Sequence, residues 1–264
     1  MAVGDVAAAP ARIPVYLFAG QSNMLGAYTH TPEVAAYKPK LDVPLSDVLF
    51  WGPTSDAPRR WGSLSSSTEN RNNAFGAGFG PELSAAHGLR ALHPTGRMAI
   101  FKYAVNGSDL GWMWRADRKS GLYRRMLDRY NYATARLRTE TGLSPYLAGV
   151  FWMQGEADGT RRSWANAYGT NLTELIEGVR RDFRAPEVPF VMGHIQDARK
   201  WYPDFAPYTH IVRAKQFEVA KADPHTFLVS TDGLERRATI SPVHFNTKGT
   251  IDLGYRFVRN HYGL

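Results

Sequence analysis

Cysteine is absent from this 264-residue chain, which excludes disulfide bonds, thiol catalysis and cysteine-based metal sites. No run of eighteen apolar residues occurs, so the sequence predicts no membrane span. An H-E-x-x-H pair, a P-loop and a Gly-rich dinucleotide fingerprint are also missing, so no metal, ATP or NAD is implied and no cofactor is expected. Any chemistry therefore has to come from the side chains of a globular protein, whose 44% hydrophobic and 21% charged residues are ordinary proportions.

The charge balance is basic, but the charge is spread along the chain. Lys and Arg number 32 against 24 Asp and Glu, which gives a net charge of +8, and many of them occur as pairs such as Arg124-Arg125. There is no block of five basic residues and no nucleic-acid motif, so we expect no nucleic-acid partner. A solvated basic surface is the simplest interpretation, and attraction of an anionic polysaccharide is the alternative.

The first ten residues, from Met1 to Pro10, lack the basic region and the long apolar core of a signal peptide. They could be the start of a mature secreted or periplasmic chain with an added Met if a signal peptide was removed, and otherwise the chain is expected to be cytoplasmic. We expect residues 1–12 to form a flexible leader and residues 13–264 to form a single domain.

Strand-like apolar runs alternate with helix-like segments along the rest of the chain. This alternation predicts an α/β fold in which helices cover both faces of a mostly parallel sheet. Residues 28–79 are rich in Pro, Ser, Gly and Asn, and we expect them to form a long loop region over the sheet. The predicted strands are 13–19, 98–104, 146–153, 188–194 and 226–230, and the predicted helices are 81–92, 121–141, 163–183, 208–222 and 247–261.

A serine follows the first predicted strand. Ser22 comes two residues after Gly20, past the carboxyl end of the run from Ile13, where α/β sheets usually build their sites. Met24 stands where the lipase-type G-x-S-x-G elbow has its second glycine, so that motif is absent. On this evidence alone, a helix N-cap is the simpler interpretation of Ser22.

Two further segments change that interpretation. Gly20-Gln-Ser-Asn-Met24, Trp152-Met-Gln-Gly-Glu-Ala-Asp158 and Val243-His-Phe-Asn-Thr-Lys-Gly249 resemble, in this order, the SGNH hydrolase superfamily. Within that superfamily, the motifs most resemble the sialate O-acetylesterase and carbohydrate esterase family 6 (acetylxylan esterase-like) branch. The likeness runs from about Ile13 to Val258. It implies a flavodoxin-like three-layer α/β/α sandwich, and a serine esterase that removes O-acetyl groups from a poly- or oligosaccharide through an acyl-enzyme.

An ester hydrolase needs a nucleophile, a base and an oxyanion hole. Ser22 is the candidate nucleophile, and His244, which stands just before a predicted helix, is the candidate base. The resemblance places the oxyanion donors on the backbone N–H of Ser22, on Gly78 or Gly80, and on the side-chain amide of Gln154. The alternatives are that the glycines only turn the chain and that Gln154 only caps a strand end.

The base lacks the carboxylate that usually accompanies it. The superfamily typically carries Asp three residues before the histidine, and Ser241 occupies that position here. A serine holds the imidazole tautomer weakly, and it cannot stabilise imidazolium as a carboxylate does. Three explanations compete: the acid is Glu156, Asp158 or Asp232, or a backbone carbonyl orients the ring of a Ser–His dyad, or this chain is catalytically impaired.

Polar and aromatic residues beside these motifs are the candidates for substrate contacts, namely Gln21, Asn23, Asn106 and Trp112. Trp112 and Trp114 suit a sugar platform, and they fit a buried core equally well. Two rival functions stay open. One is a carbohydrate O-acetyltransferase that uses the same site, and the other is a carbohydrate-binding SGNH-like module without catalysis.

Overall fold

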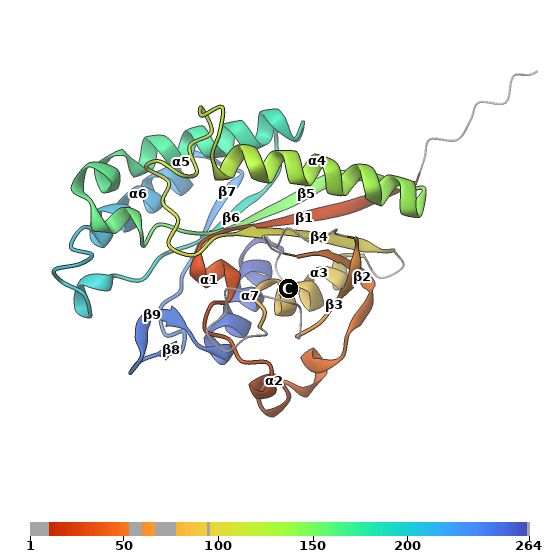
Figure 1. The fold of residues 1–264 in the computed structure, drawn as a ribbon, viewed down its shortest axis with the longest axis horizontal. Coiled ribbons are helices and arrows are strands. Elements are labelled where there is room, and N and C mark those ends of the chain that lie inside the picture. Colours follow the sequence, from red (N-terminus) through yellow and green to blue (C-terminus); the bar gives the residue numbers. More distant parts are fainter. Residues whose placement is uncertain (1–10, 53–59, 67–77, 94–95, 263–264) are drawn as a thin grey trace, which may run out of the picture.

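Three layers make up the computed structural model, which describes residues 11–52, 60–66, 78–93 and 96–262 (Figure 1). Helices α4 (Leu122–Thr141), α5 (Arg162–Asp182) and α6 (Thr209–Ala222) lie on one face of a sheet, and α3 (Glu82–Leu89) and α7 (Thr247–Tyr262) lie on the other. This arrangement confirms the predicted α/β sandwich. The sheet strands, in spatial order, are β3 (Gly62–Leu64), β2 (Leu45–Trp51), β4 (Met98–Ala104), β1 (Arg12–Gly20), β5 (Ser144–Met153), β6 (Phe190–Gly193) and β7 (Thr226–Val229).

The central strand is β1, which pairs in parallel with β4 on one side and β5 on the other. Its residues from Ile13 to Gly20 are all buried, as expected for a strand covered on both faces. Gly20 aligns with Ala104 of β4 and with Met153 of β5. The carboxyl ends of three neighbouring strands therefore meet at one edge of the sheet, which is where this kind of fold builds ligand sites.

The expectation that residues 28–79 form only a loop region is wrong in part. Helix α2 (Pro32–Tyr37) packs beside α7 and not on the sheet. Strand β2 joins the sheet in parallel with β4, and β3 pairs antiparallel with β2 as the edge strand. Strand β2 gives only a weak sequence signal because Ser46 and Asp47 interrupt its buried apolar residues. Residues 53–59 and 67–77 of this region lie outside the described residues.

The remaining elements differ from expectation only in detail. The helix predicted over 81–92 divides into α3 and a 3₁₀ turn, η2 (Arg90–Leu92). A two-stranded hairpin of β8 (Arg236–Arg237) and β9 (Ser241–Phe245) was not predicted. Most of the predicted leader, residues 1–10, lies outside the described residues. Among the helices that the structure describes, none has the length and the apolar character needed to cross a bilayer.

A buried ion pair fastens the sheet to the helices beside the carboxyl edge. Lys102 of β4 donates from Nζ to both carboxylate oxygens of Glu82, at 2.7 and 2.8 Å, and to the Leu25 carbonyl at 3.1 Å. Both charged side chains are almost fully buried. Burial lowers the pKa of Lys102, so the carboxylate of Glu82 is needed to keep the ammonium charged.

Lys102→Met should therefore lower the free energy of unfolding by about 3–5 kcal/mol, because it leaves the Glu82 carboxylate buried without a partner. Urea unfolding measures the loss. The double variant Lys102→Met/Glu82→Leu is the matched control and should lose less than Lys102→Met alone, since no unpaired charge stays buried. A single variant that loses under about 1 kcal/mol would show that this pair does not hold the layers together.

Candidate active site

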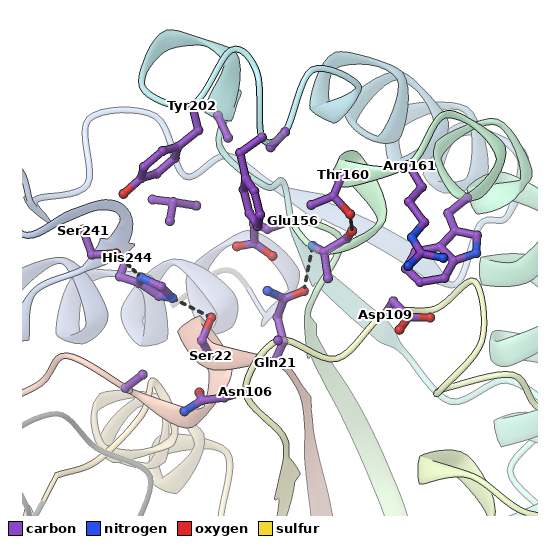
Figure 2. Close-up of a pocket in the computed structure, with 18 of the residues that line it drawn as sticks. Gln21, Ser22, Asn106, Asp109, Glu156, Thr160, Arg161, Tyr202, Ser241 and His244 are labelled. Carbon is purple, nitrogen blue, oxygen red and sulfur yellow. Dashed lines mark hydrogen bonds between the residues drawn. The ribbon is translucent and has the colours of Figure 1, made fainter.

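A serine, a histidine and a second serine form a hydrogen-bonded row at the carboxyl edge of the sheet (Figure 2). Ser22 Oγ lies 2.8 Å from Nε2 of His244, and Nδ1 of the same ring lies 2.7 Å from Ser241 Oγ. The structure thus brings together the residues predicted as nucleophile and base, and it makes Ser241 the partner of the ring.

The end of β1 fixes the position of Ser22. Gly20 has φ +148°, and a side chain there would collide with the Met153 carbonyl of β5. The backbone N–H of Gln21 donates to that same carbonyl at 2.9 Å. Helix α1 (Ser22–Leu25) then begins, with Gln21 as its N-cap and Ser22 as its first residue. The N-cap interpretation of Ser22 is therefore wrong, and its hydroxyl is available to the histidine.

Asn23 ties this helix to the strand that carries His244. Its Oδ1 accepts from the backbone N–H of Phe245 at 3.0 Å, and its Nδ2 donates to the Val243 carbonyl at 3.1 Å. The same Nδ2 donates to Glu156 Oε1 at 2.7 Å. Asn23 is buried and fixes the backbone on both sides of His244. It is not among the described residues that line the pocket, so its position is that of a structural residue and not of the predicted substrate contact.

Burial sets the charge of His244. It lowers the pKa of the imidazole to about 4, because a buried site disfavours the charged form. Among the described residues, no carboxylate forms a hydrogen bond or an ion pair with the ring. The ring of Tyr28 stacks on it instead, with 4.6 Å between the centroids and 25° between the planes. His244 is therefore neutral at pH 7, which is the form that a general base requires.

Two of the three candidate acids are buried near the site and have other partners. Glu156 accepts from Asn23, and burial raises its pKa. Asp158 accepts from the backbone N–H groups of Leu110 and Gly111, and burial raises its pKa to about 7. The structure does not bring either carboxylate to His244.

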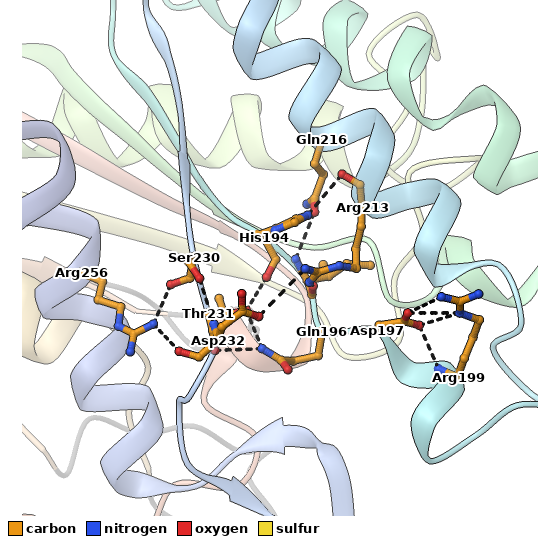
Figure 3. A network of polar contacts seen from close by, with 11 residues as sticks. His194, Gln196, Asp197, Arg199, Arg213, Gln216, Ser230, Thr231, Asp232 and Arg256 are labelled. Carbon is orange, nitrogen blue, oxygen red and sulfur yellow. Dashed lines mark hydrogen bonds and ion pairs between the residues drawn. The ribbon is translucent and has the colours of Figure 1, made fainter.

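The third candidate acid, Asp232, lies in a polar network beyond the ends of β6 and β7 (Figure 3). Its side chain is 74% exposed and its nearest cation is Arg213, at 4.0 Å. In the same network, Gln196 Nε2 donates to the Thr231 carbonyl at 2.9 Å and braces the loop that follows β6. Asp232 is thus placed to support a loop, and it makes no contact with His244.

The predicted oxyanion donors are only partly at the pocket. Gln154 is fully buried, and its Nε2 donates to the Ser108 carbonyl at 3.0 Å and to Asp158 at 2.6 Å. The N–H of Gly80 donates to Glu82 at 2.9 Å. Neither of these residues, nor the buried Gly78, is among the described residues that line the pocket. Of the predicted donors, only Ser22 lines it.

A cavity of about 740 Å³ opens beside Ser22 and His244. The predicted contacts Gln21 and Asn106 line it, and Figure 2 places Asn106 beside Ser22. The side chain of Gln21 also accepts from the backbone N–H of Gly155 at 3.2 Å, which braces the loop after β5. Sequence reasoning missed much of the wall, namely Tyr28, Thr160, Arg161, Trp164, Tyr202 and Phe205.

The two tryptophans of the loop after β4 have opposite environments. Trp114 is fully buried, and its Nε1 donates to Ser108 Oγ at 2.8 Å. Trp112 is 58% exposed, and the guanidinium of Arg118 lies 3.4 Å from its ring centroid. Trp112 does not line the pocket among the described residues, although the neighbouring Gly111 packs on the pocket residue Trp164. Trp114 therefore belongs to the core, and of the two tryptophans only Trp112 has a ring that a bound sugar could reach from the solvent.

The described residues include no cluster of three His, Asp or Glu side chains arranged to hold a metal ion. What the site does contain is a neutral imidazole between two hydroxyl groups, next to a cavity. Such an arrangement can remove a proton from a serine and direct the oxygen at an electrophile in the cavity.

The family model for carbohydrate esterase, sialic acid-specific acetylesterase matches residues 12–262. The chain belongs to this family. It is accordingly a carboxylic ester hydrolase, and its general activity is carbohydrate deacetylation. No curated protein matches the chain significantly.

Solved structures show the same fold. A protein from Arabidopsis thaliana has a TM-score of 0.73 and 22% identity, over 97% of this chain and 99% of that one. NanS has a TM-score of 0.67 and 16% identity, over 95% and 97%. A carbohydrate acetylesterase from Xanthomonas citri has a TM-score of 0.61 and 20% identity, over 95% of this chain and 56% of that one.

Proposed function

We propose that this esterase removes O-acetyl groups from a poly- or oligosaccharide through an acetyl-enzyme formed on Ser22. The observation that carries the proposal is the 2.8 Å contact between Ser22 Oγ and Nε2 of His244 at the wall of the cavity. A nucleophile within hydrogen-bond reach of a base, with the base held by a third group, is the arrangement that nucleophilic catalysis needs.

The reaction runs in two steps. Nε2 of His244 takes the proton of Ser22 while Oγ attacks the acetyl carbonyl carbon, and the imidazolium then gives that proton to the departing sugar oxygen. A water molecule next attacks the carbonyl carbon of the acetyl-enzyme and loses a proton to Nε2 of His244. The bond between Ser22 Oγ and the acetyl group then breaks, the imidazolium returns the proton to Oγ, and acetate leaves. Nε2 must be unprotonated at the start, so the active tautomer carries its proton on Nδ1. The Nδ1–H group donates a hydrogen bond to Ser241 Oγ.

The oxyanion is stabilised by donors at the ends of β1 and β4. One is the backbone N–H of Ser22, in the first turn of α1, where amides have no partner within the helix. The others are the N–H of Gly107 and the side chain of Asn106, which follow β4 and line the cavity. This set replaces Gly78, Gly80 and Gln154. The amide of Gln154 supports the loop after β4 through Ser108 and Asp158.

The cavity wall suits a sugar ring. Trp164 and Tyr202 offer aromatic faces, and the guanidinium of Arg161 lies 4.2 Å over the ring of Trp164. Asp109 lines the same cavity as Arg161, so the cavity wall carries both a negative and a positive side chain. The intact contact between Ser22 and His244 favours a catalytic protein over a carbohydrate-binding module.

Ser22→Ala should lower kcat for p-nitrophenyl acetate and for acetylated sugars by at least about 10⁴-fold, because no other hydroxyl of the described residues contacts Nε2 of His244. Acetate release measures activity, and the far-UV circular dichroism spectrum verifies the fold. Ser66→Ala, at a buried serine outside the cavity, is the control and should keep kcat. A folded Ser22→Ala variant with near-normal turnover would refute the proposal.

Ser241→Asp should raise kcat by about 10-fold or more, since a carboxylate stabilises imidazolium better than a hydroxyl does. The base acts only when neutral, so the acid limb of the pH–rate profile follows the His244 pKa, which burial holds near 4. The new negative charge raises that pKa, and the acid limb should move upward by about 1–3 pH units.

The neutral variant Ser241→Asn separates charge from shape and should leave the acid limb where it is in the unmodified enzyme. Initial rates between pH 3.5 and 9 would decide the matter for all three proteins. If Ser241→Asp changed neither kcat nor the acid limb, some group other than Ser241 would be the partner of the ring.

A further inference from the structure

Beside the row of hydroxyl and imidazole groups lies an aromatic ring that the proposed reaction does not use. Tyr28 stands three residues after α1, lines the cavity, and is partly buried. Its ring lies nearly parallel to the His244 imidazole, with 4.6 Å between the centroids and 25° between the planes. One face of the base is thus covered by a π system.

Backbone geometry and an ion pair hold Tyr28 in that position. Gly26 ends α1 with φ +80°, and a side chain there would collide with the Phe79 carbonyl. On the other side, Arg237 donates from Nε to the Tyr28 carbonyl at 3.2 Å and pairs with Glu33 at 3.0 Å. The loop that carries Tyr28 is therefore fixed against β8.

The same hairpin holds both partners of the histidine. Arg237 of β8 is the register partner of Ser241 in β9, and Ser241 contacts Nδ1 of His244. The edge of the imidazole and its face are thus both positioned by the β8–β9 hairpin, the edge by a hydroxyl and the face by the anchored tyrosine.

The reaction creates a positive charge where the surroundings oppose it. When Ser22 loses its proton, His244 becomes imidazolium, and burial lowers the pKa of this ring. Among the described residues, the titratable groups that share the cavity with His244 are Tyr28, Asp109, Glu156, Arg161 and Tyr202, and Arg237 of β8 donates to the Tyr28 carbonyl. Arg237 is occupied by Glu33, and Glu156 is held by Asn23. A cation over an aromatic face is attracted by the quadrupole of the ring.

We propose that Tyr28 is a positioning residue that takes over part of the role of the missing carboxylate, since its ring fixes the plane of His244 and stabilises the imidazolium. The inference rests on the proposed function of Ser22 and His244. The tyrosine hydroxyl has no part in it, so an aromatic ring at position 28 is sufficient.

The direct test compares Tyr28→Leu, which removes the π face and keeps an apolar side chain, with Tyr28→Phe, which keeps the ring. Tyr28→Leu should lower kcat for p-nitrophenyl acetate by about 10-fold and leave KM within about twofold. Tyr28→Phe should keep kcat within about twofold of the unmodified enzyme. Should Tyr28→Leu fail to fold, Tyr28→Met gives the same comparison with a flexible side chain.

A second measurement uses Ser241→Asp as the background, where a carboxylate already stabilises the imidazolium. Tyr28→Leu should cost less kcat there than in the unmodified enzyme, because the two groups serve the same charge. In that background the acid limb should move to lower pH when the ring is removed, since imidazolium loses a stabilising neighbour.

Three results would overturn the inference. Equal losses in Tyr28→Phe and Tyr28→Leu would assign the effect to the hydroxyl, a rise in KM at constant kcat would make Tyr28 a substrate contact, and an unchanged kcat in Tyr28→Leu would deny it any role. Ser22→Ala, measured in parallel, keeps the two proposals distinct. Its turnover at a normal rate would refute the proposed function, whereas its inactivity beside a fully active Tyr28→Leu would refute only the inference.

Discussion

The site depends on the two hydrogen bonds that join the side-chain amide of Asn23 to the backbone of Val243 and Phe245. Ser22 and His244 are 222 residues apart in the chain, and their side chains meet because one buried amide joins the first helix to the last strand. The amide can do this only in one orientation, and Glu156 selects that orientation by accepting from Nδ2. A carboxylate predicted as a catalytic acid thus contributes by fixing the backbone beside the base.

The second constraint is electrostatic. Burial lowers the pKa of His244 to about 4, so at pH 7 the ring is in the neutral form that accepts a proton. The same burial destabilises the imidazolium that forms when the ring takes the proton of Ser22. In Ser-His-Asp sites a carboxylate stabilises the imidazolium. Here the partner of Nδ1 is the Ser241 hydroxyl, and the ring of Tyr28 covers one face. In our account, dipoles and a π face replace a full charge, so the site is expected to be slower than a triad and tolerant of acid.

Much of the fold could be predicted because its central strands are continuous apolar runs, as in β1 and β4, and because the long helices alternate with them. In β2 the apolar residues are interrupted by Ser46 and Asp47, and β9 is short and half-buried, so neither strand has a periodicity strong enough to identify. The motifs around Ser22 and His244 predicted that these residues share one site, and their side chains are in hydrogen-bond contact. The orientation of Gln154 could not be read from its motif, since buried Asp158 turns the amide away from the cavity. The stack of Tyr28 depends on the hairpin and carries no sequence signal.

The central claim, that a hydroxyl orients a neutral histidine toward Ser22, is tested most directly by ¹⁵N NMR of the imidazole of His244, with its signals assigned by comparison with His244→Gln. The account predicts a neutral ring at pH 7 that carries its proton on Nδ1, with a pKa of about 4. A ring that is protonated near pH 6.5, or one that is neutral with its proton on Nε2, would contradict the account.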